Sequence, residues 1–110
     1  MWYSIIGEDV PDSLPLRKEL RPAHLERIEE LSKVGRVLAA GPNPVEDFPL
    51  AEGGSNQRLN QPTEAGFSGS IMIVDFDSLE EATRWANGDP YLTGGVFSKV
   101  TVKPFMKVLP

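Results

Sequence analysis

Cysteine is absent from this chain of 110 residues, and the absence excludes several kinds of chemistry at once. No disulfide, thiolate nucleophile or cysteine-ligated metal centre is available, which favours a reducing compartment. No stretch approaches the roughly 20 apolar residues that a membrane span needs, and the first residues lack the basic region of a signal peptide. We therefore expect a soluble, cytoplasmic protein with no membrane partner.

Positive charge is scarce as well. The sequence holds 11 Lys and Arg against 16 Asp and Glu, a formal net charge of −5. A nucleic-acid-binding protein usually carries a basic stripe, because neutralising phosphates supplies much of its affinity. Lys99, Lys103 and Lys107 recur at every fourth position of an expected strand, a spacing typical of one solvated side. The sequence therefore predicts no nucleic-acid partner.

Histidine occurs only once, at His24. A metal site needs more ligands than one histidine and scattered carboxylates provide. No glycine-rich fingerprint opens a helix, so a nucleotide cofactor is not indicated either. We expect no metal and no cofactor.

The residues that are present have the composition of one globular domain spanning residues 1–110, with 40% apolar and 25% charged side chains. Apolar periodicity and turn residues divide the chain into four strands and two helices. The order is β-α-β-β-α-β, the ferredoxin-like α+β plan with an antiparallel sheet. Strands are expected at 1–7, 37–41, 69–76 and 96–109, and helices at 16–34, with a break at Pro22, and at 78–88. A long loop is expected at 42–67.

The first and third expected strands carry apolar side chains on both faces. In the first strand Tyr3 and Ile5 alternate with Trp2 and Ile6, and residues 71–74 are apolar without interruption. Two helices cover only one face of such a sheet, and a second copy of the chain is the economical cover for the other. The pattern predicts a homodimer.

His24 lies in the middle of the apolar side of the first expected helix, where an unpaired imidazole would cost about 1–3 kcal/mol. One interpretation is a core histidine that bonds a backbone carbonyl. Arg21 and Arg17 precede it by one and two turns on the same side, which favours a pocket, although both could extend to solvent. Asp89 is a candidate partner at a rigid turn, but aspartate before proline is also common turn chemistry.

Five short segments, in this order and with compatible gaps, resemble the YciI-like (YCII-related) family. They are Arg21-Pro22-Ala23-His24-Leu25, Gly35-Arg36-Val37-Leu38-Ala39-Ala40-Gly41-Pro42, Gly66-Phe67-Ser68-Gly69-Ser70, Asp89-Pro90-Tyr91 and Val102-Lys103-Pro104-Phe105. The main departure is a longer segment at 45–60. The resemblance implies a dimeric α+β barrel of ferredoxin-like subunits, with an active-site pair at His24 and Asp89 and with Ser70 and Arg21 near the pocket. Related members are thought to eliminate chloride from chlorinated hydroxyquinols, and the wider superfamily includes lactone isomerases and small monooxygenases.

The favoured hypothesis is a cofactor-free enzyme that moves a proton during elimination or isomerisation of a small, phenolic or anionic molecule. His24 would be the general base and Asp89 would orient it, since a carboxylate fixes the imidazole tautomer. Arg21 would contact an anion, and Ser70 and Tyr91 would donate hydrogen bonds in the pocket. The 42–67 loop would form a wall or lid. The alternatives are a non-catalytic module that binds a small molecule or regulates, and a dimer with a purely structural histidine.

Overall fold

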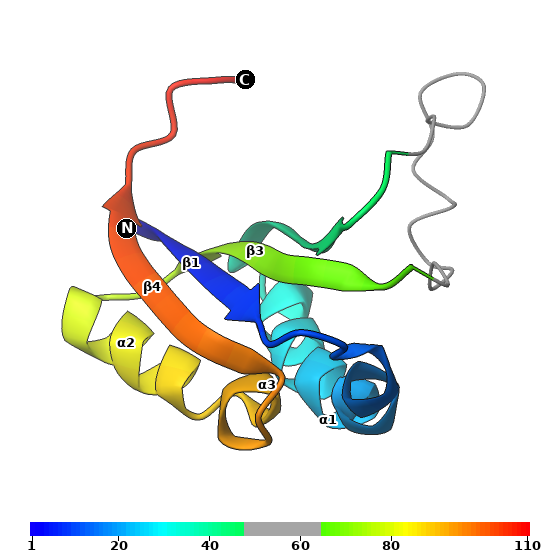
Figure 1. Cartoon of the computed structure of the whole chain (residues 1–110). Coiled ribbons are helices and arrows are strands. Elements are labelled where there is room, and N and C mark those ends of the chain that lie inside the picture. Colours follow the sequence, from blue (N-terminus) through cyan, green and yellow to red (C-terminus); the bar gives the residue numbers. More distant parts are fainter. Residues whose placement is uncertain (48–64) are drawn as a thin grey trace.

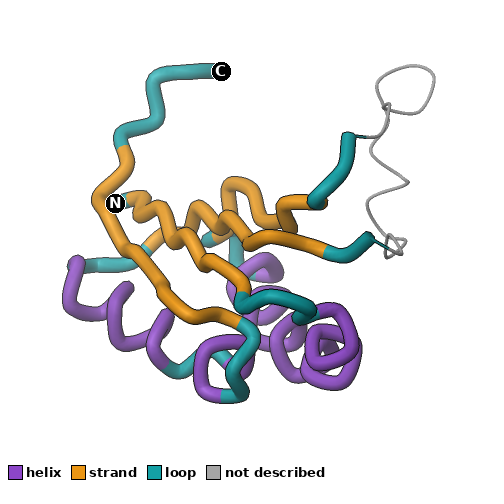
Figure 2. Tube along the Cα trace, in the orientation of Figure 1, coloured by secondary structure: helices purple, strands orange, loops and turns teal. Residues whose placement is uncertain are grey.

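The computed structural model describes residues 1–47 and 65–110, and it has the α+β plan expected from the sequence (Figure 1). Four strands form one antiparallel sheet in the order β2-β3-β1-β4. The three helices of the described residues lie on one face of this sheet, as Figure 2 shows. The elements are β1 (Trp2–Asp9), α1 (Leu14–Lys33), β2 (Val37–Pro44), β3 (Phe67–Asp75), α2 (Leu79–Asn87), α3 (Pro90–Thr93) and β4 (Phe97–Phe105).

The hydrophobic core lies between the sheet and the helices. Alternation along β1 turns Tyr3 and Ile5 toward the helices, where they pair in register with Val74 and Met72 of β3. Small residues of α2 and Ile28 of α1 complete the buried cluster. The two central strands therefore supply much of the surface on which the helices pack.

Helix α1 runs without interruption through Pro22, so the predicted break at this residue was wrong. Proline removes one helical hydrogen bond, here the bond to the carbonyl of Lys18. Both residues are on the exposed side of the helix, where water can satisfy that carbonyl. The continuous helix holds all residues from Arg17 to Ile28 on one rigid element.

Several element ends differ from the sequence predictions, and one short helix was not predicted. Strand β2 extends to Pro44, and β4 ends at Phe105, four residues earlier than expected. The predicted turn after α2 contains a short helix, α3, whose first turn Asp89 caps by accepting a hydrogen bond from the Tyr91 amide at 2.8 Å. Most of the expected 42–67 loop, residues 48–64, lies outside the described residues.

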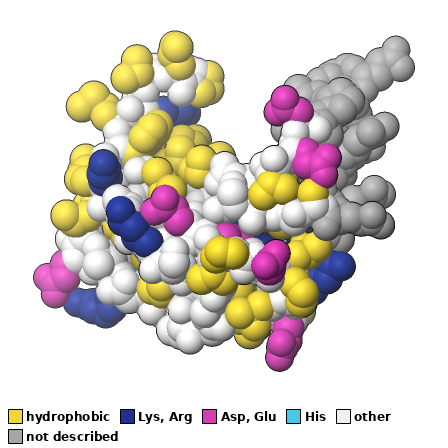
Figure 3. Space-filling model, viewed as in Figure 1, with side chains coloured by type: hydrophobic (Ala, Val, Ile, Leu, Met, Phe, Trp, Pro, Cys, Tyr) yellow, Lys and Arg dark blue, Asp and Glu magenta, His cyan; other side chains and the backbone are white. Residues whose placement is uncertain are grey.

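The sheet face opposite the helices carries exposed apolar side chains. Ile6 and Ile71 pair across β1 and β3 and are 38% and 40% exposed. Figure 3 shows further hydrophobic side chains around the C-terminal segment, on the side of the sheet away from the helices. Among the helices of residues 1–47 and 65–110, none combines the length and the apolar character required to cross a lipid bilayer.

Candidate functional site

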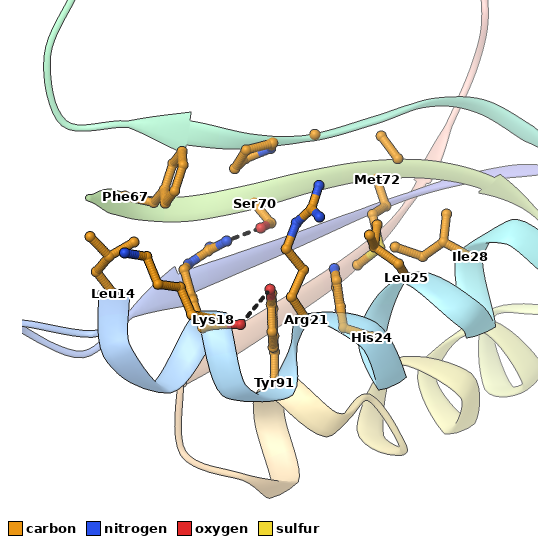
Figure 4. Close-up of a pocket in the computed structure, with 14 residues that line it drawn as sticks. Leu14, Lys18, Arg21, His24, Leu25, Ile28, Phe67, Ser70, Met72 and Tyr91 are labelled. Atoms are coloured by element: carbon orange, nitrogen blue, oxygen red, sulfur yellow. Dashed lines mark hydrogen bonds between the residues drawn. The ribbon is translucent and has the colours of Figure 1, made fainter. Parts of the chain in front are cut away.

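A cavity of about 350 Å³ lies between α1 and the sheet (Figure 4). Helix α1 supplies most of its floor, β2 and β3 supply its roof, and α3 adds one aromatic wall. Phe67, Met72 and Ile28 give it apolar surfaces, and His24 and Ser70 are polar groups among them. A mostly apolar cavity with a few polar groups is the usual form of a small-molecule site.

The imidazole of His24 is bonded to the carboxylate of Asp89. Nδ1 lies 2.8 Å from Oδ1 and 3.0 Å from Oδ2, and the residues are 7% and 2% exposed. An ionised carboxylate only accepts hydrogen bonds, so Nδ1 is the nitrogen that donates in this contact, and in the neutral imidazole it is Nε2 that has the lone pair. The contact joins α1 to the cap of α3 across 65 residues of sequence. It leaves His24 with a basic nitrogen on a side chain that lines the cavity.

Tyr91 contributes its ring to the cavity wall, while its hydroxyl group is engaged in the protein. The ring stacks on His24, and the hydroxyl donates to the carbonyl of Arg17 at 3.3 Å. Burial raises the pKa of Tyr91 above 10.0, although the cationic Arg17 and Arg21 oppose the shift. The structure therefore places this residue at the site as a rigid neutral surface.

The hydrogen bonds of Arg17 at this site were not predicted from the sequence. Its guanidinium is buried and ion-paired with Asp9, with Nε at 2.6 Å and Nη2 at 2.8 Å from the carboxylate oxygens. Nη2 also donates to the Gly69 carbonyl and to the Ser70 hydroxyl, both at 2.9 Å. The helical spacing places Arg17 on the side of His24, but only the fold brings Asp9 and Ser70 to it.

Arg21 and Lys18 lie along the cavity and are largely exposed. Neither has an ion-pair or hydrogen-bond partner among the described residues, and no Asp or Glu is among the described residues that line the cavity. The electrostatic character of the opening is therefore positive. This is unusual in a chain with a net charge of −5 and suits an anionic ligand.

The grouped side chains are suited to moving a proton beside an anion. A base oriented by a carboxylate contributes typically 10²–10⁴-fold to a proton-transfer step. The strand–turn–helix elbow of serine hydrolases is missing around Ser70, which lies within β3. Over residues 1–47 and 65–110, no three His, Cys, Asp or Glu residues cluster closely enough to hold a metal ion.

The family model for the YCII-related domain matches residues 1–106 of the chain. The chain belongs to this family. The YciI protein of Escherichia coli is 46% identical over 108 residues, which cover 98% of this chain and 99% of that protein. A protein of Haemophilus influenzae is 42% identical over the same coverage. Family membership agrees with the resemblance seen in the sequence.

A solved structure shares the fold of this YCII-related chain. It is the 5-chloro-2-hydroxyhydroquinone dehydrochlorinase of Burkholderia phenoliruptrix in complex with 2,5-dihydroxybenzoquinone. The TM-score is 0.75 at 23% identity, and the match covers 96% of this chain and 94% of the other. At this identity the likeness establishes the ferredoxin-like arrangement of helices and sheet, and no more.

Proposed function

We propose that this YCII-related protein is a cofactor-free enzyme that removes a proton from a small ring compound during elimination or isomerisation. The observation that carries the proposal is the buried contact between His24 and Asp89 beside the cavity. The carboxylate keeps hydrogen on Nδ1, so Nε2 is the atom that accepts the proton. Asp89 then stabilises the imidazolium that forms.

Chlorinated hydroxyquinols are the substrate class that we propose. The name of the protein with the same fold supports this class, as do the flat aromatic walls and the positive opening of the cavity. Elimination of HCl removes one proton and one chloride, and the electron pair of the carbon–chlorine bond leaves with chloride. The step therefore needs a base and no change of oxidation state in the protein.

The test is chloride release from 5-chloro-2-hydroxyhydroquinone by the wild type, by His24→Gln and by a control, Glu30→Gln, on the exposed side of the same helix. We expect the wild type and the control to turn over and His24→Gln to be slower by about 10²-fold or more. Equal rates for all three proteins would contradict the role of His24. Binding by the wild type without turnover would instead favour the non-catalytic binding module.

We also propose that the uncovered sheet face is the interface of a homodimer, the dimeric α+β barrel expected from the sequence. Ile6 and Ile71 lie side by side on this face, and Ile73 and Trp2 are the neighbouring apolar residues on it. Apolar side chains gathered on one face are stabilised by burial against a matching face. Sedimentation should give twice the 12.1 kDa chain mass, and a 12.1 kDa species at micromolar concentration would refute the proposal.

A further inference from the structure

We propose that Ser70 and Arg17 form an oxyanion site in the cavity, which accepts a negatively charged oxygen of the ligand. The inference rests on the proposed use of the cavity as a ligand site and adds the chemical class of the ligand. That class is a planar compound with an acidic enol or phenol group. Arg17 acts here as a positioning residue, because it works through the Ser70 hydroxyl.

The position of Arg17 is fixed before any ligand enters. Asp9 holds Nε and Nη2 in a two-pronged ion pair, and the Gly69 carbonyl accepts a further hydrogen bond from Nη2. The Ser13 hydroxyl donates to the same Asp9 carboxylate, which keeps that group in place. A buried guanidinium held on two sides has no freedom to turn away from Ser70.

This arrangement makes the Ser70 hydroxyl a hydrogen-bond donor. A serine hydroxyl has one hydrogen to donate and lone pairs that accept. The guanidinium of Arg17 occupies the acceptor side at 2.9 Å, and no acceptor among the described residues takes the hydroxyl hydrogen. Ser70 lines the cavity (Figure 4). Its hydroxyl hydrogen can therefore bond a ligand there. A charged donor on its oxygen also polarises the hydroxyl and strengthens the bond that it donates.

Charge around the pair favours an oxygen that is ionised. Arg17 uses Nε and Nη2 in its bonds, and Nη1 has no partner in the described part of the chain. Asp9 neutralises the charge of Arg17, so the net positive charge comes from Lys18 and Arg21 at the cavity edge. The carboxylate of Asp89 is taken up by His24 and the α3 cap. Donors that are fixed in position and shielded from water stabilise an anion more strongly than mobile, water-exposed donors do, and Arg17 and Ser70 are both buried.

In the proposed elimination, the oxyanion site would stabilise negative charge while His24 acts as the base. Removal of a proton from a hydroxylated ring places negative charge on a ring oxygen. If that oxygen lies against Ser70 while His24 Nε2 takes the proton, the charge that develops is met by a donor already in position. The ligand class is therefore one whose acidic oxygen and transferable proton share a conjugated ring.

The experiment compares the binding of two quinones of similar size at neutral pH. The first is 2,5-dihydroxybenzoquinone, which is acidic, and the second is 2,5-dimethylbenzoquinone, which has methyl groups in place of the hydroxyls and cannot ionise. The chain has no cysteine to react with either compound. We expect the wild type to bind the acidic quinone at least about tenfold more tightly, the scale of a hydrogen bond to a charged group.

Ser70→Ala should reduce the affinity for the acidic quinone about tenfold and leave the dimethyl compound within about threefold. Ser68→Ala is the matched control on the same strand, because Ser68 is exposed and its hydroxyl donates to the Asn43 carbonyl. Folding should tolerate the Ser70 change, since Arg17 keeps its bonds to Asp9 and Gly69. In an Arg17→Lys background, the effect of Ser70→Ala should shrink, because the two residues act together.

The inference is overturned if the wild type fails to prefer the acidic quinone, including the case in which it binds neither. It is also overturned if Ser70→Ala weakens both compounds equally. Should Arg17→Lys fail to fold, the Ser70 and Ser68 variants still decide the outcome. The result is separate from the test of catalysis. If the protein prefers the acidic quinone but releases no chloride, the oxyanion site is supported and the proposed enzymatic activity is not. If it releases chloride but does not prefer the acidic quinone, the activity is supported and the oxyanion site is not.

Discussion

The imidazole of His24 lies flat against the ring of Tyr91, with centroids 3.8 Å apart and planes within 7° of parallel. Tyr91 follows Asp89 by two residues, so one short helix supplies both the carboxylate and the stacking surface. The ring of Phe97 packs beside both rings with its plane nearly perpendicular to theirs. His24 is thus held through Nδ1 and through the face of its ring, and no reorganisation is needed to orient Nε2.

Replacing Asp89 with asparagine should separate the effect of this residue on His24 from its effect on folding. An amide oxygen can still accept the hydrogen bond from the Tyr91 amide, so the cap of α3 survives. The amide no longer stabilises an imidazolium, and turnover should fall about 10²–10⁴-fold. The measurements are the steady-state rate of turnover of the chlorinated hydroxyquinol and the free energy of unfolding, each for the wild type and for Asp89→Asn. A variant that keeps wild-type turnover would show that Asp89 serves only the turn.

The raised pKa of Tyr91 predicts a loss of stability at alkaline pH. Because burial raises this pKa above 10.0, the folded state holds the phenolic proton more tightly than the unfolded state does. The contribution of the neutral Tyr91 side chain to the free energy of unfolding is fully present below pH 10. It disappears as the pH rises through the pKa that Tyr91 has in the folded state. Denaturant unfolding at a series of pH values should show the decline in the wild type.

Tyr91→Phe should remove this alkaline decline and lower the free energy of unfolding by about 1 kcal/mol at neutral pH, since the Arg17 carbonyl loses a donor. Tyr3→Phe is the matched control because it removes the other tyrosine and keeps Tyr91. An unchanged alkaline slope in Tyr91→Phe would assign the effect to another group.

A methyl group at Gly7 should disturb the packed rings of His24, Tyr91 and Phe97. A Cβ at this position would lie 2.6 Å from the ring of Phe97, which contacts His24 and Tyr91. We expect Gly7→Ala to lower the free energy of unfolding by about 1–3 kcal/mol and to slow turnover. Gly41→Ala is the control for stability, because in the described part of the chain no atom beyond Gly41 and its two chain neighbours lies within 4 Å of an added Cβ. Equal free energies for the two variants would contradict the prediction.

A charge on the uncovered sheet face should dissociate the proposed homodimer. Ile71→Asp places a carboxylate beside Ile6, in the middle of that face, where an interface would bury it without a partner. Sedimentation at several concentrations should show a shift to the 12.1 kDa monomer. Val34→Asp adds the same charge at an exposed apolar position after α1 and should sediment as the wild type does. If both variants behave alike, the face is not the interface.

The fold was largely predictable because it depends on periodic features. The alternation of Tyr3 and Ile5 with Trp2 and Ile6 predicts a strand that packs helices on one side, and the strand order follows from the β-α-β-β-α-β sequence. Pro22 misled the prediction, because the cost of proline depends on whether the carbonyl that loses its donor can reach water. Helix α3 was missed because four residues carry no periodicity.

The candidate site was harder to predict from the sequence, because its hydrogen bonds join residues that are far apart in the chain. His24 was found from its place on a helix face, and Asp89 entered as its partner through turn chemistry and family resemblance. The bonds of Arg17 to Asp9 and Ser70 depend on how β1, α1 and β3 meet. The homodimer and the cytoplasmic location stay predictions.

The double use of Asp89, as helix cap and as partner of the imidazole, gives this protein an internal probe. The backbone amide of Tyr91 donates to Oδ1, the same oxygen that lies nearest His24. The nuclear magnetic resonance frequency of that one amide therefore reports the protonation of a side chain on another helix. A titration followed at a single backbone signal can read the state of the proton-transfer pair without a substrate or an engineered label.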